Sequence, residues 1–158
     1  MSVNHASLEK ESLDREFHTK FAKASFNFVW TLLEKKERTV EEKDDMVNAA
    51  HASRYHWGIV GTPIHFARGE WQISRVYSVI HQPHAAIYHA EKCLQICLDN
   101  GIGDFDIAYA YEALARAYHV LGQIEQRDRF IDLGKIAGQL IEKEPDRKLF
   151  FSDIEDLQ

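Results

Sequence analysis

Cysteine, proline and methionine are scarce in this chain of 158 residues, which contains two cysteines, three prolines and two methionines. Cys93 and Cys97 lie four positions apart and so one turn apart on a predicted helix, where small buried thiols are the usual arrangement. Two cysteines so placed do not form the cysteine-rich framework of a small secreted domain. We therefore expect free thiols and a cytoplasmic protein.

Long apolar runs and an excess of positive charge are also missing. No apolar run approaches the length of a membrane span, and the N-terminus lacks the basic start and apolar stretch of a secretory signal. The formal net charge of −6 disfavours nonspecific binding to nucleic acid or to anionic membranes. We expect neither nucleic acid nor a membrane as a partner.

Motifs that carry catalysis or bind a cofactor do not occur. The chain has no G-x-S-x-G nucleophile elbow and no glycine-rich phosphate loop, and Gly58-x2-Gly61 is too short to hold a phosphate. No H-E-x-x-H metal pair is present either. The sequence therefore predicts a protein that is not an enzyme and that uses no cofactor.

Helical periodicity dominates the chain, and no segment shows the alternation of a strand. Hydrophobic residues make up 45% and charged residues 28% of the chain, which is ordinary for one soluble globular domain. Thr39 with Glu42 has the pattern of a capping box, and Pro63 and Pro83 fit the first turns of helices. The sequence predicts an all-α fold with helices over 7–36, 40–57, 63–81, 83–98, 108–122 and 123–143, and a short helix after Pro145.

The most regular pattern extends from Ala108 to Gly122. Bulky residues recur there at helical spacing, small alanines lie between them, and a glycine ends the segment. Such a helix can lie very close to a neighbour, as stacked helical hairpins require. The same internal spacing occurs twice, 41 positions apart: Ile73-Ser74-x2-Tyr77 with Ala86-x3-Ala90-x2-Cys93, and Leu114-Ala115-x2-Tyr118 with Arg127-x3-Ile131-x2-Gly134.

Residues 67–141 resemble the tetratricopeptide repeat, whose hairpin has an aromatic-x2-Leu-Gly/Ala-x2-Tyr helix followed by an Ala-x3-aromatic-x2-Ala helix. Tyr111-x2-Leu114-Ala115-x2-Tyr118 matches the first helix of that hairpin. The chain departs from the pattern at Glu70, Arg127 and Gly134, and its offset exceeds the 34 residues of the family. It is also similar to bacterial proteins of tetratricopeptide-like type, a likeness that implies no activity.

The resemblance implies a right-handed α-α superhelix of about three helical hairpins with a C-terminal capping helix. The capping helix would carry the polar outer face that such stacks need at their ends. The first two helices fit only by analogy, as a divergent leading hairpin. The expected units are 1–62 for the leading hairpin, 63–99 and 104–144 for the next two, and 146–158 for the cap.

In such a stack the first helix of each hairpin lines a concave groove, which would bind a protein or peptide partner. Arginines and aromatic rings on one face suit a partner with acidic groups and an apolar part. The alternative is that the arginines pair with acidic residues of the chain itself, as exposed charges usually do. The residues expected to face the groove are Arg68, Trp71, Arg75, Ser78, Tyr109, Glu112, Arg116 and His119.

Histidines offer a second hypothesis, a metal-binding sensor or an enzyme with its site near residues 51–70. Zinc sites on helices use ligands at i, i+3 or i, i+4. His51 and His56 are five positions apart, which separates their rings around the helix. A metal site would therefore have to combine residues of different helices, such as His51, His65 and Glu70.

A third hypothesis is a structural homo-oligomer, such as a homodimer, in which the first helix pairs with its copy. Phe17, Phe21 and Phe28 form a stripe on that helix at helical spacing. We predict that this stripe belongs to the core of the domain. Trp30 lies off the stripe and would serve self-association if it were exposed.

Overall fold

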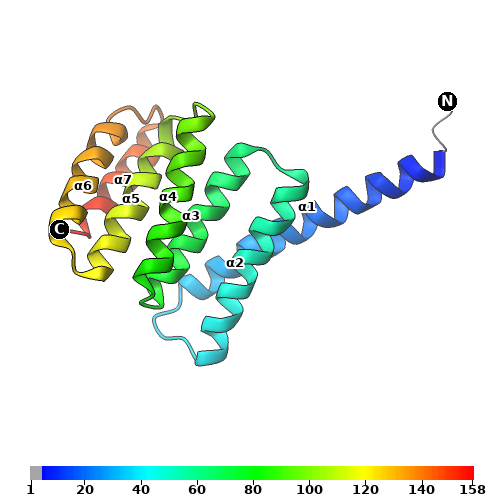
Figure 1. Cartoon of the computed structure of the whole chain (residues 1–158), viewed down its shortest axis with the longest axis horizontal. Helices are drawn as coiled ribbons and strands as arrows, with labels where there is room; N and C mark the ends of the chain where they lie inside the picture. The colour runs from blue at the N-terminus through cyan, green and yellow to red at the C-terminus, as the bar shows by residue number, and fades with distance from the viewer. Residues whose placement is uncertain (1–4) are drawn as a thin grey trace.

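The computed structural model describes the backbone of residues 5–158 and the side chains of residues 9–158. Within this part of the chain, seven helices follow one another and no strand occurs, which confirms the predicted all-α class. Figure 1 shows α1 to α6 in chain order across the molecule, with α7 overlapping α5 and α6 in this view. They are α1 (His5–Leu33), α2 (Val40–Val60), α3 (Pro63–Val79), α4 (Pro83–Asp99), α5 (Asp104–Leu121), α6 (Ile124–Gly138) and α7 (Glu144–Glu155).

Local signals in the sequence set several helix ends. The Thr39 hydroxyl accepts the backbone N–H of Glu42 at 3.2 Å, and the Glu42 carboxylate accepts the N–H of Thr39 at 3.0 Å, so the predicted capping box is confirmed. Prolines occupy the first turns of α3, α4 and α7. Gly122 follows α5 with φ of +78°, the left-handed conformation that favours glycine.

Consecutive helices pack against each other as hairpins, with α1 on α2, α3 on α4 and α5 on α6. The predicted close packing of α5 is present, since its five alanines are all buried. Ala110 contacts a cluster formed with the buried thiols of Cys93 and Cys97, and both cysteines are free, as predicted. Small side chains on α4 and α5 thus let the helices of neighbouring hairpins approach closely.

The phenylalanine stripe of α1 is not part of the core, so that prediction was wrong. Phe17, Phe21 and Phe28 are 54%, 50% and 44% exposed. The face of α1 that carries Ala22 packs on α2 instead, and the Ser53 hydroxyl donates to the Ala22 carbonyl at 2.8 Å. A helix can approach small Ala22 this closely, whereas a row of phenylalanine rings would hold it away.

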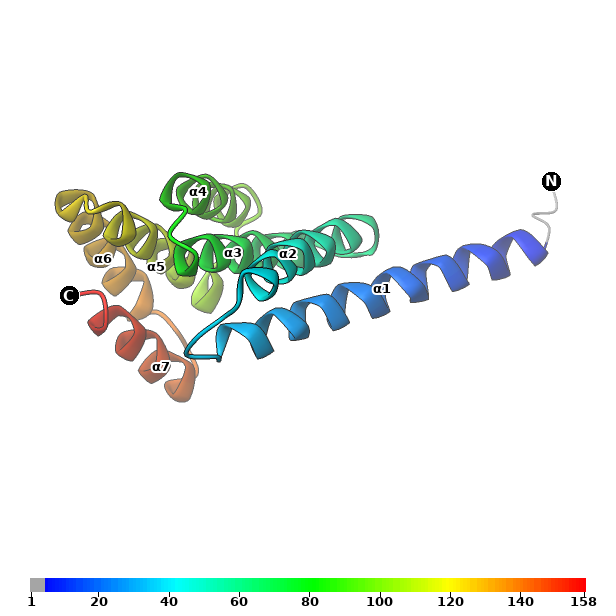
Figure 2. The same cartoon turned by 90° about the horizontal axis from the view of Figure 1, so that it is seen from below.

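Helix α7 packs on the last hairpin, which α5 and α6 form. Phe150, Ile154 and Leu157 are buried, whereas Leu149 is exposed. The buried three form a core cluster with Tyr109 of α5 and other residues of α5 and α6. Figure 2 shows α7 beneath α5 and α6, on the same side of the molecule as α1. No helix in the described residues is long and apolar enough to cross a membrane.

Gly138 marks the tightest approach of α7 to α6. A Cβ atom there would lie 2.4 Å from Cε1 and 2.6 Å from Cδ1 of Phe150, whose ring is fully buried. Contacts this short require the backbone or the ring to move. Gly103 offers a control, because a Cβ atom at that position meets nothing within 4 Å.

We predict that Gly138→Ala lowers the free energy of unfolding by about 2 kcal/mol, since overpacking outweighs the gain in helix propensity. Urea unfolding followed by circular dichroism measures the change. Gly103→Ala should leave the unfolding midpoint within error of the original. Equal stability of the two variants would contradict the packing described for α7.

Candidate functional site

A cavity of about 990 Å³ lies on the side of the stack that α1 and α7 flank. Helices α3 and α5 form its floor, the C-terminal half of α1 forms one wall, and α7 with Lys143 before it forms the other. Half of the lining residues have aromatic or aliphatic side chains, and seven of the eighteen are charged. The lining residues are Phe26, Trp30, Ile64, Ala67, Arg68, Trp71, Arg75, Cys93, Ile102, Gly103, Asp104, Phe105, Asp106, Tyr109, Lys143, Asp146, Leu149 and Asp153.

Trp71 of α3 lies at the centre of the aromatic lining. Its ring centroid is 5.7 Å from that of Trp30 on α1 and 5.8 Å from that of Tyr109 on α5. Tyr109 in turn contacts Phe105 at 4.4 Å. A continuous row of rings therefore connects three helices, and aromatic pairs at such distances stabilise their arrangement.

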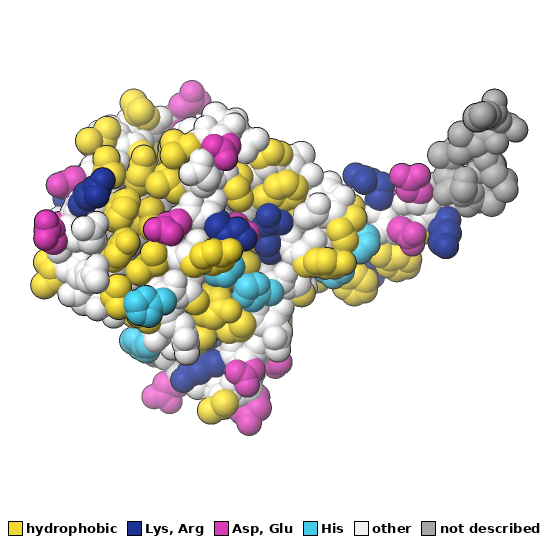
Figure 3. All heavy atoms as spheres, viewed as in Figure 1, with side chains coloured by type: hydrophobic (Ala, Val, Ile, Leu, Met, Phe, Trp, Pro, Cys, Tyr) yellow, Lys and Arg dark blue, Asp and Glu magenta, His cyan; other side chains and the backbone are white. Residues whose placement is uncertain are grey.

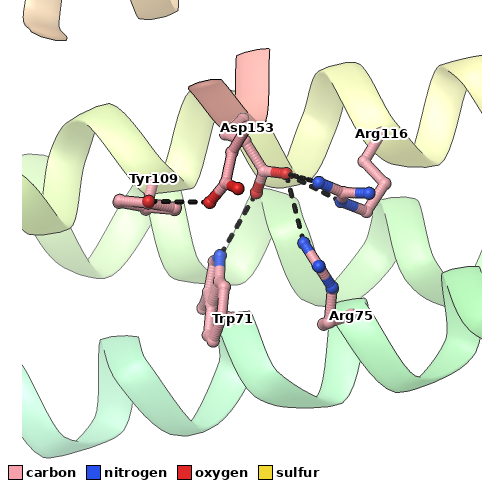
Figure 4. A network of polar contacts seen from close by, with 6 residues as sticks. Trp71, Arg75, Tyr109, Arg116 and Asp153 are labelled. Carbon is pink, nitrogen blue, oxygen red and sulfur yellow. Dashed lines mark hydrogen bonds and ion pairs between the residues drawn. The ribbon is translucent and has the colours of Figure 1, made fainter. Parts of the chain in front are cut away.

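Beneath this row, α3 and α5 are tied together by Glu112, whose side chain is 1% exposed (Figure 4). Arg116, one turn further along α5, donates from Nε to Oε1 at 2.7 Å and also from Nη2. From α3, Trp71 Nε1 donates to Oε2 at 3.4 Å and Arg75 Nη1 donates to Oε1 at 3.5 Å. One buried carboxylate thus holds both the central ring and two guanidinium groups.

Arg75 has donors to spare at the cavity. A guanidinium carries five N–H donors, and only the 3.5 Å bond to Glu112 occupies one of them among the described residues. Burial and the neighbouring charge of Arg116 lower the pKa of Arg75. A partly buried guanidinium with unused donors is suited to hold a carbonyl or carboxylate oxygen of a ligand.

Arg68 joins the two helices of the cavity floor through a carboxylate, and Tyr109 joins the floor to α7 in the same way. Arg68 of α3 makes two parallel bonds to Asp106 of α5, at 2.7 and 3.0 Å, and this pairing raises the pKa of the arginine. The Tyr109 hydroxyl donates to Asp153 of α7 at 2.8 Å. Burial and this hydrogen bond raise the pKa of Tyr109, so the phenol stays protonated.

The eight residues predicted to face the groove divide into two sets. Arg68, Trp71, Arg75 and Tyr109 line the cavity. The other four do not line it: Glu112 is buried beneath the rings, Arg116 binds Glu112, Ser78 is buried near the end of α3, and His119 is exposed near the end of α5. The arginines Arg68, Arg75 and Arg116 all pair with carboxylates of the chain, which is the alternative that the sequence left open.

Sequence reasoning missed the two walls. Trp30 is not an exposed residue for self-association but packs on Trp71, and Phe26 beside it also lines the cavity. Asp153 and Lys143 come from the other end of the chain. In the sequence, only the position of Trp30 off the phenylalanine stripe indicated that it lies on a different face of the helix. In the structure that face lines the cavity.

A second polar cluster lies outside the cavity and centres on Glu70, whose side chain is 2% exposed. The carboxylate accepts bonds from Arg54 Nε of α2 at 2.9 Å and from His89 Nδ1 of α4 at 2.7 Å, with Lys92 Nζ at 3.3 Å. Burial raises the pKa of Glu70, but the hydrogen bond from His89 and the charges of Lys92, His89 and Arg54 lower it overall. Glu70 therefore joins α2, α3 and α4 as an ionised group.

The histidines proposed as metal ligands lie in different surroundings. His51 Nε2 lies 3.0 Å from the Tyr77 hydroxyl, and its ring contacts that of His89. His65 accepts the N–H of Thr62 at the start of α3 and stacks on Trp57 at 4.1 Å. Figure 3 shows histidine side chains gathered on one face of the helical body. Among the residues with described side chains, no three His, Cys, Asp or Glu groups are placed to hold a metal ion.

No known protein family matches this chain, and neither a curated protein nor a solved structure matches it. The geometry of the cavity and the chemistry of its lining therefore carry the functional argument.

We predict that Glu112→Gln lowers the free energy of unfolding by about 3 kcal/mol, because it leaves the Arg75 and Arg116 guanidiniums without a carboxylate. Thermal and urea unfolding measure the loss. Glu91→Gln, at an exposed position of α4, is the matched control and should change stability little. A loss no larger than that of the control would contradict the role given to Glu112.

The Glu70 cluster predicts a dependence on pH. Because the pKa of Glu70 is lower in the folded chain than its ordinary value of 4.5, its stabilising contribution is present above that value and is lost as pH falls through the folded pKa. Glu70→Gln should therefore be less stable than the original chain at pH 7, and the difference should shrink as the pH falls below 4.5. Urea unfolding across this range measures it. A difference that stays constant with pH would contradict an ionised Glu70.

Proposed function

We propose that this chain is a peptide-binding module of tetratricopeptide-like type, which holds an apolar segment of a partner in the cavity between α1, α3, α5 and α7. The observation that carries the proposal is the row of aromatic rings along an open cavity of about 990 Å³. Binding cavities in proteins commonly measure ~300–1,000 Å³ and combine apolar walls with a few polar groups. Stacked helical hairpins also bind their partners on concave faces.

The charges of the lining favour an apolar segment over a strongly acidic one. Arg68 and Arg75 are engaged by Asp106 and Glu112. The other charged residues of the lining are one base, Lys143, and three acids, Asp104, Asp146 and Asp153. No free cluster of positive charge is therefore offered to an acidic partner. The unused donors of Arg75 suit a backbone carbonyl or a C-terminal carboxylate of a peptide.

The enzyme and metal-sensor hypotheses find less support in the geometry. His65 is engaged with Thr62 and Trp57, while Glu70 is surrounded by three basic side chains. The free, buried cysteines fit the reducing conditions of the cytoplasm, which we propose as the location of the protein.

Blocking the cavity tests the proposal. A random peptide library is panned against the original chain, and the affinity of the selected peptides is measured by isothermal titration calorimetry. Gly103 lines the cavity, and a Cβ atom there meets nothing within 4 Å, so Gly103→Trp adds a bulky ring at the cavity without a clash at Cβ. We predict that this variant binds the selected peptides at least about tenfold more weakly, a loss of ~1.4 kcal/mol.

Leu140→Trp is the control, since Leu140 is 73% exposed and does not line the cavity. It should bind the peptides as the original chain does. Peptides that bind Gly103→Trp with unchanged affinity, or a panning experiment that enriches no peptide, would argue against the proposed function.

A further inference from the structure

The N-terminal part of α1 extends beyond the rest of the molecule (Figure 2). Helix α2 runs back along α1, with His56 against His18 at a ring distance of 5.0 Å, and ends one turn later at Val60. Every side chain from Glu9 to Phe17 is exposed. An isolated helical segment of this length is only marginally stable in water, so a further contact would be needed to stabilise it.

The projecting helix carries an apolar stripe that continues along the body of the molecule. Leu13, Phe17, Phe21, Ala24 and Phe28 follow one another at spacings of four, four, three and four residues, and all five are exposed. Figure 3 shows apolar side chains along this part of α1. The stripe is about 22 Å long at 1.5 Å per residue. A continuous exposed apolar surface of this kind marks an interaction site.

We infer that this stripe is the interface of an antiparallel homodimer, in which α1 of one copy packs along α1 of a second copy. With a two-fold axis close to Phe21, Leu13 faces Phe28 of the second copy, and Phe17 faces Ala24. Bulky Phe17 then meets the smallest residue of the stripe. The stripe is thus complementary to itself in the antiparallel direction, as a two-fold interface requires.

The charges along α1 favour the same direction. Residues 9–16 have a net charge of −2 and residues 17–28 a net charge of +2. In this antiparallel register Lys23 lies opposite His18 of the second copy and within one helical turn of its Glu16, whereas parallel pairing places Glu16 opposite Glu16 and Lys23 opposite Lys23. The charged residues are Glu9, Lys10, Glu11, Asp14, Arg15 and Glu16 in the first segment, and Lys20 and Lys23 in the second.

Helix α2 adds apolar surface beside the stripe. Tyr55 is 67% exposed and Ile59 is 43% exposed. The His56 ring lies between Tyr55, at 5.5 Å, and Phe21, at 5.7 Å. The interface therefore involves two helices of each copy, which enlarges the area that the dimer buries. Stable complexes bury about 800 Å² per partner.

The dimer does not depend on the proposed peptide site. None of the stripe residues lines the cavity, which receives Phe26 and Trp30 from the opposite side of α1. Failure of either proposal therefore leaves the other intact.

Analytical ultracentrifugation of the full chain tests the inference. The original chain should sediment as a dimer, and Phe17→Glu/Phe21→Glu should halve the molar mass while the unfolding midpoint of the helical body is retained. Ile136→Glu/Leu140→Glu changes two apolar residues of comparable exposure near the end of α6 and should remain a dimer. A monomeric original chain, or a dimer that persists in the Phe17→Glu/Phe21→Glu variant, would overturn the inference.

Disulfide crosslinking tests the direction of pairing, and the two native cysteines do not interfere because both are buried. Phe21→Cys should crosslink to its own copy. Leu13→Cys should crosslink with Phe28→Cys in a mixture of the two variants, but not with itself. Self-crosslinking of Leu13→Cys would show parallel pairing and contradict the proposal. So would a chain that stays monomeric and instead binds vesicles of phosphatidylcholine and phosphatidylglycerol through the stripe.

Discussion

The buried carboxylate of Glu112 is the interaction on which the arrangement of the cavity depends. It lies on α5 and accepts hydrogen bonds from both Trp71 and Arg75 of α3. Taking a carboxylate and two guanidiniums out of water is costly, and the mutual attraction of the three groups offsets that cost only while all of them remain in place. The network therefore adds a polar link between α3 and α5 to the apolar packing of the two helices.

The rest of the site follows from that constraint. With its Nε1 donating to Glu112, the Trp71 ring contacts Trp30 of α1 and Tyr109 of α5. The alanines of α5 allow the close approach that brings these side chains together. Tyr109 then reaches Asp153, which links the floor of the cavity to α7. A polar centre beneath a row of aromatic rings is thus fixed by contacts from three parts of the chain.

Much of this structure could be predicted from local patterns in the sequence. The helices could be predicted from periodicity, the start of α2 from Thr39 and Glu42, and the turn after α5 from Gly122. The helical phase also placed Arg68, Trp71 and Arg75 on one face of α3, because residues three and four apart share a face. What could not be predicted was the pairing of those arginines with Asp106 and Glu112, since it depends on how two helices meet in space.

The errors concerned longer-range packing. An apolar stripe such as that of Phe17 and Phe21 indicates a face that needs a partner, but periodicity alone does not distinguish the chain's own core from a second molecule. Two faces of α1 are apolar, and small Ala22 decided which of them α2 could approach. The walls formed by Trp30 and by α7 were missed for a related reason. They lie far along the chain from the helices that they flank, and no local pattern connects them.

The central claim is that the cavity beside Trp71 binds a peptide, and the three tryptophans of the chain allow a direct test. Trp30 and Trp71 line the cavity, whereas Trp57 stacks on His65 outside it. In nuclear magnetic resonance spectra, titration with a peptide selected by panning should shift the indole N–H signals of Trp30 and Trp71 and leave that of Trp57 in place. A peptide that shifts only the Trp57 signal, or binds with no change at Trp30 and Trp71, would contradict the account.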